Sequence, residues 1–139
     1  MKCVLISIFT IITLYSSEVL SCTESKDPEA VVQAQLDAYN AHDVEQFISC
    51  YSSDIKMQQL REGGPSLVGK KAFSKAYQFL KTVPKEYKVI LENRMVNGPI
   101  VIDHERLTGL GEGEEDKLFI AIYEVRDGKI TNLWFPVSQ

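Results

Sequence analysis

Residues 87–110 read YKVILENRMVNGPIVIDHERLTGL, and this stretch decides the fold. Apolar and polar side chains alternate over residues 87–92, a two-residue period that is typical of a β-strand with one buried face. Residues 97–99 read NGP, which is a turn signal, and residues 100–110 then continue as a second strand. The stretch therefore predicts an antiparallel hairpin.

Two more strands are expected after this hairpin. Residues 111–116 form an acidic, glycine-rich loop, residues 118–125 a third strand, and residues 129–137 a fourth, with an Asp-Gly turn at 127–128. Together the four strands predict an antiparallel meander at the C-terminal end of the chain.

Helical patterns come before the strands. Asp27 and the proline after it suit the N-cap and first position of a helix, and Asp43 can cap a second helix whose apolar positions run on to Tyr51. A third helix is expected between residues 69 and 84. Three helices before a meander predict one α+β domain over residues 28–139, with the helices packed on one face of a curved antiparallel sheet.

Residues 1–21 are predicted to be a signal peptide. Residues 3–15, CVLISIFTIITLY, would span roughly 20 Å as a helix, which is too short for the hydrocarbon core of a bilayer. The following Val19–Cys22 resembles a bacterial lipobox, so we expect an exported protein of the bacterial envelope that is anchored to the membrane only through lipid on Cys22. Ordinary cleavage after Ser21, giving a secreted or periplasmic protein, is the alternative. Residues 22–27 then form a tether.

The two fates of Cys22 have different consequences for Cys50. A lipid on Cys22 leaves Cys50 as a lone thiol, whereas an unmodified Cys22 can pair with Cys50 in an oxidising compartment. Cys3 leaves with the signal peptide in either case.

Composition argues against several classes of partner. The 139 residues carry a formal charge of −4, which leaves no basic surplus for a nucleic acid. The two histidines and three dispersed cysteines are too few for a closed zinc site, so we expect no metal and no other cofactor.

Several motifs in order along the chain resemble one known family. They are AYNAHDV at 38–44, YSSD at 51–54, GKKA at 69–72, VIDHERLTG at 101–109 and YEVRDGKI at 123–130. This series is similar to nuclear transport factor 2-like proteins of the SnoaL-like branch, and the likeness extends from about residue 28 to residue 136. It implies a cone-shaped α+β barrel, but this fold supports many activities, so function depends on the site itself.

The resemblance also allows the catalytic residues of one relative to be compared with this sequence. Ketosteroid isomerase, the relative that illustrates carboxyl pKa tuning, needs a Tyr and two Asp at positions that correspond here to Gln35, Gln59 and Ile122. Glutamine is no proton acceptor and isoleucine donates no hydrogen bond. We therefore expect no steroid isomerisation by that mechanism, and whether the protein is an enzyme stays open.

Asp103 and Glu105 are the candidate catalytic residues. They are two residues apart on a strand, so both side chains project from one face about 7 Å apart. The resemblance places that face inside the cone, where two poorly solvated acids would raise at least one pKa and suit general acid or base chemistry. Two other roles remain open: orientation of a ligand, and structural pairing with Arg94 or Lys88.

The expected function is binding of a small, largely apolar organic molecule inside the cone, with cofactor-independent proton transfer or hydration if the protein is an enzyme. The residues expected to line that pocket are Gln35, Tyr39, Met57, Gln59, Ile120 and Ile122.

The alternative is a non-catalytic module that forms a homodimer or binds a partner through the open face of the sheet. The residues expected on that face are Ile100, Ile102, Phe119, Ala121 and Tyr123.

Overall fold

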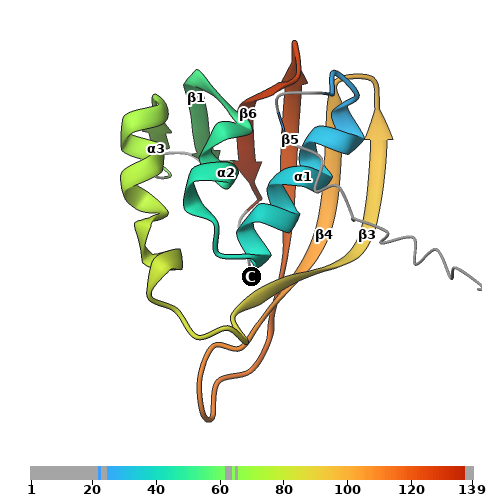
Figure 1. The fold of residues 1–139 in the computed structure, drawn as a ribbon. Helices are drawn as coiled ribbons and strands as arrows, with labels where there is room; N and C mark the ends of the chain where they lie inside the picture. The colour runs from blue at the N-terminus through green and yellow to red at the C-terminus, as the bar shows by residue number, and fades with distance from the viewer. Residues whose placement is uncertain (1–21, 23–24, 62–63, 65, 137–139) are drawn as a thin grey trace, which may run out of the picture.

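The structure is a computed structural model that describes residue 22 and residues 25–61, 64 and 66–136. The predicted signal peptide lies outside the described residues. Three helices lie against one face of a curved sheet (Figure 1). The elements in chain order are α1 (Pro28–Asn40), α2 (Val44–Ser49), β1 (Tyr51–Gln59), β2 (Ser66–Val68), α3 (Lys70–Ala76), the 3-10 helix η1 (Gln78–Lys81), β3 (Lys88–Asn97), β4 (Ile100–Thr108), β5 (Lys117–Arg126) and β6 (Lys129–Phe135).

The described part of the sheet has six strands in the order β2-β1-β6-β5-β4-β3. Strands β3 to β6 are the predicted antiparallel meander, which is confirmed. The sheet is larger than this meander and mixed, because β1 adds beside β6 in parallel and β2 pairs with β1. Most side chains of β1 are polar and exposed, so the sequence gives no apolar pattern that would reveal its partner.

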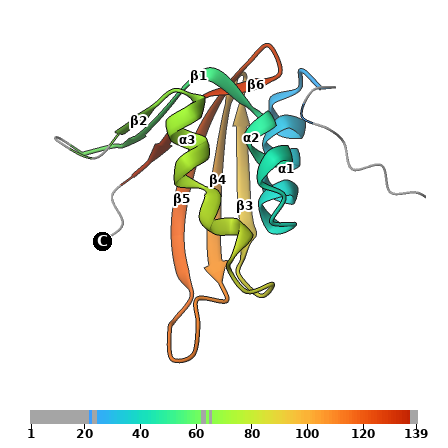
Figure 2. The ribbon, with the colours of Figure 1, turned by 60° about the vertical axis from the view of Figure 1, so that its left-hand side comes forward.

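All three helices cover the concave face of the sheet, and the β4–β5 hairpin extends beyond them (Figure 2). Buried side chains from α1, α2, α3, η1 and the inward face of the strands form one apolar core, in which Phe47, Tyr51 and Phe73 pack ring against ring. No helix among the described residues is long and apolar enough to span a bilayer.

Both predicted N-caps are confirmed. The Asp27 carboxylate accepts from the backbone N–H of Ala30 at 3.3 Å, and that of Asp43 accepts from Gln46 at 3.0 Å. The second helix ends earlier than expected, because Tyr51 is the first residue of β1 and not the last turn of α2.

The turn between α1 and α2 is fastened to β3. The Asn40 amide donates to the carbonyl of Val89 and accepts from its N–H, both at 2.8 Å. His42 has a φ of 56° and its Nε2 lies 2.8 Å from the carbonyl oxygen of Tyr87. The histidine thus has a structural role at this turn.

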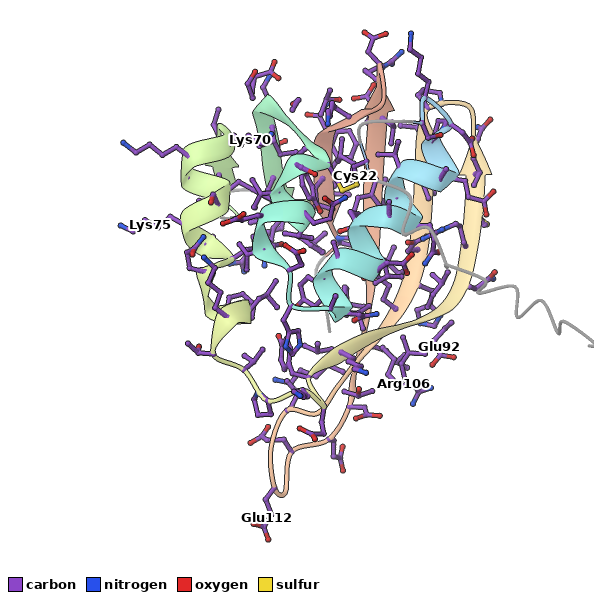
Figure 3. The ribbon with its side chains drawn as sticks, in the orientation of Figure 1. Cys22, Lys70, Lys75, Glu92, Arg106 and Glu112 are labelled. Atoms are coloured by element: carbon purple, nitrogen blue, oxygen red, sulfur yellow. A yellow bond between two sulfur atoms is a disulfide. The ribbon has the colours of Figure 1, made fainter. Side chains whose placement is uncertain are left out.

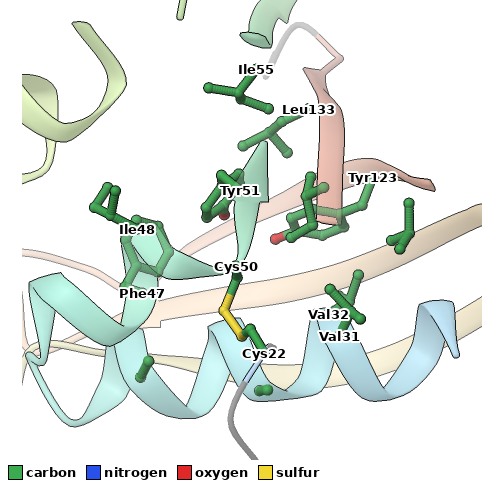
Figure 4. Packing of buried hydrophobic residues seen from close by; sticks show 14 of the residues in the cluster. Cys22, Val31, Val32, Phe47, Ile48, Cys50, Tyr51, Ile55, Tyr123 and Leu133 are labelled. Atoms are coloured by element: carbon green, nitrogen blue, oxygen red, sulfur yellow. A yellow bond between two sulfur atoms is a disulfide. The ribbon is translucent and has the colours of Figure 1, made fainter. Parts of the chain in front are cut away.

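Cys22 and Cys50 are joined by a disulfide, with Cα atoms 4.8 Å apart, and both are buried in the core (Figure 4). A sulfur that is bonded to another cysteine cannot carry a thioether lipid. The structure thus has the pairing that was considered for an unmodified Cys22, and lipidation of Cys22 stays a prediction. The predicted tether is accordingly fastened at its first residue to the end of α2.

Candidate functional site

A cavity of about 90 Å³ lies between the helices and the concave face of the sheet. Its wall is largely aromatic, with one carboxyl group and one amide. The lining residues are Gln35, Leu36, Tyr39, Phe47, Tyr51, Tyr77, Val89, Glu105, Phe119, Tyr123, Leu133 and Phe135.

Glu105 is the carboxyl group of this cavity. Strand β4 turns its side chain inward, where it is only 3% exposed. Burial, with a further contribution from the negative charge of Asp103, raises the pKa of Glu105 from 4.5 to about 8. A carboxyl group with this pKa exchanges a proton readily near neutral pH, which is what a general acid or base requires.

A chain of side-chain hydrogen bonds leads to Glu105 from the opposite wall. The Tyr51 hydroxyl donates to the Gln35 amide oxygen at 2.9 Å, and the Gln35 amide nitrogen donates to the Tyr123 hydroxyl at 3.3 Å. Tyr123 in turn donates to Oε1 of Glu105 at 3.3 Å. Each group is thereby fixed in orientation, and the chain joins α1, β1, β4 and β5 around the cavity.

Two further tyrosines present hydroxyl groups to the cavity. Burial is the main cause that raises the pKa of both Tyr39 and Tyr77 above its ordinary range, so both hydroxyls keep their protons. Tyr39 donates to the Tyr87 hydroxyl at 3.4 Å, and Tyr77 points to the thioether sulfur of Met57 at 3.7 Å. Because a thioether is a weak acceptor, the Tyr77 hydroxyl is free to donate to a ligand.

Asp103 has a different role. It is fully buried and forms a bidentate ion pair with Arg94, in which both N···O distances are 2.7 Å. Arg94 also donates to the amide oxygen of Gln33 on α1 at 3.0 Å. Asp103 does not line the cavity, so the structure assigns this acid to structural pairing with Arg94, one of the three roles considered, and leaves Glu105 as the acid of the cavity.

Four of the six residues expected in the pocket lie on its side of the sheet. Gln35 and Tyr39 line the cavity itself. Met57 and Gln59 line outer hollows that share Phe135 with the cavity wall.

Ile120 and Ile122 were placed on the wrong face. Ile120 pairs with His104 and Ile122 with Ile102, and both project from the outer face of the sheet. Their inward-facing neighbours are Phe119, Ala121 and Tyr123, which had been expected on the open face. Both faces of β5 are apolar, so alternation could not show which set points inward. Ile122 therefore does not occupy the position of a pocket acid.

The polar residues beside Asp103 and Glu105 on β4 lie on the outer face of the sheet. His104 is exposed on the outer face, and Arg106 pairs there with Glu92 at 2.6 Å (Figure 3). The described residues contain no group of three His, Cys, Asp or Glu side chains arranged to hold a metal.

Sequence reasoning missed the tyrosine hydroxyls as functional groups. Tyr51 was expected at an apolar position of the second helix and Tyr123 on the open face of the sheet, and neither hydroxyl was assigned a role. A signal was nevertheless present: buried tyrosines need hydrogen-bond partners, and the Gln35 amide, which is buried, supplies partners to two of them.

The fold is shared with several solved structures. An LEH-like epoxide hydrolase of M. tuberculosis is 16% identical, with a TM-score of 0.68 and coverage of 80% of this chain and 82% of that one. An uncharacterised cystatin-fold protein of Novosphingobium aromaticivorans is 19% identical, with a TM-score of 0.68 and coverage of 80% and 98%. An NTF2-like protein of Mesorhizobium loti is 15% identical, with a TM-score of 0.68 and coverage of 81% and 91%.

No curated protein matches the chain. At identities this low the structural neighbours establish the fold alone. The sequence profile of the SnoaL-like domain, however, matches residues 32–133, which is most of the chain. The protein therefore belongs to the SnoaL-like domain family.

Proposed function

We propose that the protein binds a small, largely apolar carbonyl compound in its cavity, and that Glu105 exchanges a proton with it. One observation carries the proposal: a buried carboxyl group with a pKa near 8 lines an aromatic cavity. Apolar walls bind the carbon skeleton, while hydroxyl donors such as that of Tyr77 hold the oxygen.

The proposed step needs no cofactor. The Glu105 carboxylate takes a proton from the carbon next to the carbonyl group, and the electron pair of the C–H bond moves to the oxygen, giving an enolate. A tyrosine hydroxyl stabilises that negative charge by a hydrogen bond. Return of the proton from Glu105 to carbon restores a neutral carbonyl compound.

Deuterium exchange tests this step without knowledge of the natural substrate. We expect the disulfide-bonded protein to accelerate exchange of the α-protons of cyclopentanone and 2-butanone in D₂O, followed by proton NMR. Glu105→Gln should abolish the acceleration, whereas Glu92→Gln, at an exposed glutamate on the outer face, should retain it. Equal exchange with the wild type and Glu105→Gln would contradict the proposal.

We also propose that the protein is exported and works outside the cytoplasm. The disulfide supports this location, because such bonds persist mainly in oxidising compartments. The pairing of Cys22 favours a secreted or periplasmic protein over a lipid-anchored one. Fractionation of the source cells tests this: the protein should be soluble outside the inner membrane, and retention in the cytoplasm would contradict export.

A second candidate function is self-association through the outer face of the sheet. Met95 is 61% exposed and Ile120 is 41% exposed, and with Ile102 they surround a shallow hollow. Contiguous apolar surface of this kind marks interaction sites. Sedimentation equilibrium tests it: Met95→Glu with Ile120→Lys should convert a dimer to a monomer, and a wild type that is monomeric at all concentrations would exclude it.

A further inference from the structure

The inner cavity is too small for a complete organic ligand of ordinary size. Its volume of about 90 Å³ is below that of small-molecule sites in general, which are roughly 300–1,000 Å³. A ligand with a functional group at Glu105 must therefore extend beyond the cavity.

A larger groove adjoins the cavity at one place. Its volume is about 540 Å³, and it shares Phe119 and Phe135 with the cavity wall. The two rings are half-buried, with centroids 6.2 Å apart, and they are the boundary between the two spaces. A ligand that occupies both spaces therefore requires this ring pair to rotate apart.

Among the described residues that line this groove, Lys117 alone is charged; the others are Gln59, Leu107, Leu118, Phe119, Phe135 and Pro136. Strand register explains its position. Glu105 pairs with Phe119 and Leu107 pairs with Lys117, so all four side chains have inward-facing positions. The concave face thus passes from an acid, past aromatic and aliphatic side chains, to a cation at its rim.

The nearby acidic residues do not line the groove. Glu112 lies at the tip of the β4–β5 hairpin and points away from the sheet (Figure 3). Glu114, Glu115 and Asp116 come directly before Lys117 in the chain, and none of them is among the residues that line the groove. Within the described residues Lys117 forms no ion pair.

We propose that the ligand is an elongated amphiphile, with a carbonyl head group in the inner cavity and a carboxylate held by Lys117 at the end of the outer groove. This inference rests on the proposed function, because it assigns the ligand of the same cavity. Lys117 is two residues, about 7 Å, along the strand from Phe119, so an unbranched chain of medium length spans the two sites.

Three probes of equal length test the carboxylate directly. They are 7-oxooctanoate, its primary amide, and the ammonium analogue 8-aminooctan-2-one, each titrated into the disulfide-bonded protein at pH 7 and followed by NMR shifts of Glu105 and Tyr123. We expect the carboxylate to bind about two- to fivefold more tightly than the amide, as for a single exposed ion pair. The ammonium probe should bind most weakly.

Two lysine variants test whether Lys117 causes the preference for the carboxylate probe over the amide probe. Lys117→Gln should reduce the ratio of carboxylate to amide affinity to about one, whereas Lys88→Gln, on the outer face of β3, should leave it unchanged. An unchanged ratio in Lys117→Gln, or tightest binding of the ammonium probe, would overturn the inference. If the carboxylate and the amide bind equally and still shift the Glu105 resonance, the proposed function stands and the inference about Lys117 is contradicted. If no probe shifts the resonances of the cavity residues, the proposed function and the inference are both contradicted.

Discussion

Asp103 and Glu105 project from the same face of one strand, yet their surroundings differ. Asp103 has a guanidinium partner on both carboxylate oxygens, whereas Glu105 has a tyrosine hydroxyl and an apolar cavity. One acid is therefore paired with a cation, whereas burial pushes the other towards its neutral form. Spacing alone identified the two residues, but only their partners separate the two roles.

A first prediction compares matched substitutions at these acids. Asp103→Asn leaves the buried charge of Arg94 without its partner, so it should lower the free energy of unfolding by about 3–5 kcal/mol. Glu105→Gln replaces a mostly neutral acid by an amide of similar shape and removes the cost of keeping the Glu105 proton at pH 7, so it should not destabilise the fold. Urea denaturation measures both; equal losses would contradict the separation of roles. Arg94→Met combined with Asp103→Leu should recover much of the lost stability.

A second prediction concerns the pH dependence of stability. The folded protein keeps the Glu105 proton up to a pKa of about 8, while the unfolded chain loses it near 4.5. The free energy of unfolding should therefore fall as pH rises between these values, by at most about 4 kcal/mol from this group. In Glu105→Gln this component should be absent. Parallel pH profiles for the wild type and Glu105→Gln would show that burial does not perturb this carboxyl group.

Among the elements, β5 is a strand whose position could be predicted from the sequence but whose buried face could not. Alternation identified the strand and its bounds closely, because its length and turn residues are clear. It could not identify the buried face, because apolar residues occupy both. The inward position of Ala121 follows from its pairing with Asp103, which is a long-range contact.

A third prediction tests the orientation of β5 at neighbouring residues. Ala121→Val adds volume at a fully buried site and should cost about 1–3 kcal/mol. Ile120→Ala removes volume from a partly exposed residue and should cost less than about 1 kcal/mol. Thermal unfolding of the two variants distinguishes the faces, and the reverse order of stability would restore the orientation that the sequence suggested.

The other features that were not predicted also depend on contacts between segments far apart in the sequence. The caps at Asp27 and Asp43, the three helices and the meander are local patterns, and all were predictable. The parallel pairing of β1 with β6, the Asn40 contact with β3 and the tyrosine chain to Glu105 join segments far apart in the sequence. No local period contains that information.

For the whole molecule, the disulfide links the segment before α1 to the end of α2. A fourth prediction is that removing it, in Cys22→Ala with Cys50→Ala, lowers the free energy of unfolding by about 3–4 kcal/mol, as expected for closure of a loop with a sequence separation of 28. The melting temperature should fall by several degrees or more. The cavity should persist, so ligand binding at low temperature should remain. An unchanged melting temperature would show that the bond does not stabilise the fold.

The arrangement of the whole domain places an aromatic cavity, one acid and one groove on the concave side of the sheet. Within this arrangement the fold holds Glu105 as a nearly neutral acid inside the cavity. A carbon-13 NMR titration of the glutamate side-chain carboxyl groups tests this most directly, with Glu105→Gln to assign the resonance. We expect Glu105 to titrate at a pKa near 8. A Glu105 resonance that titrates near 4.5, the ordinary value for this side chain, would contradict the account.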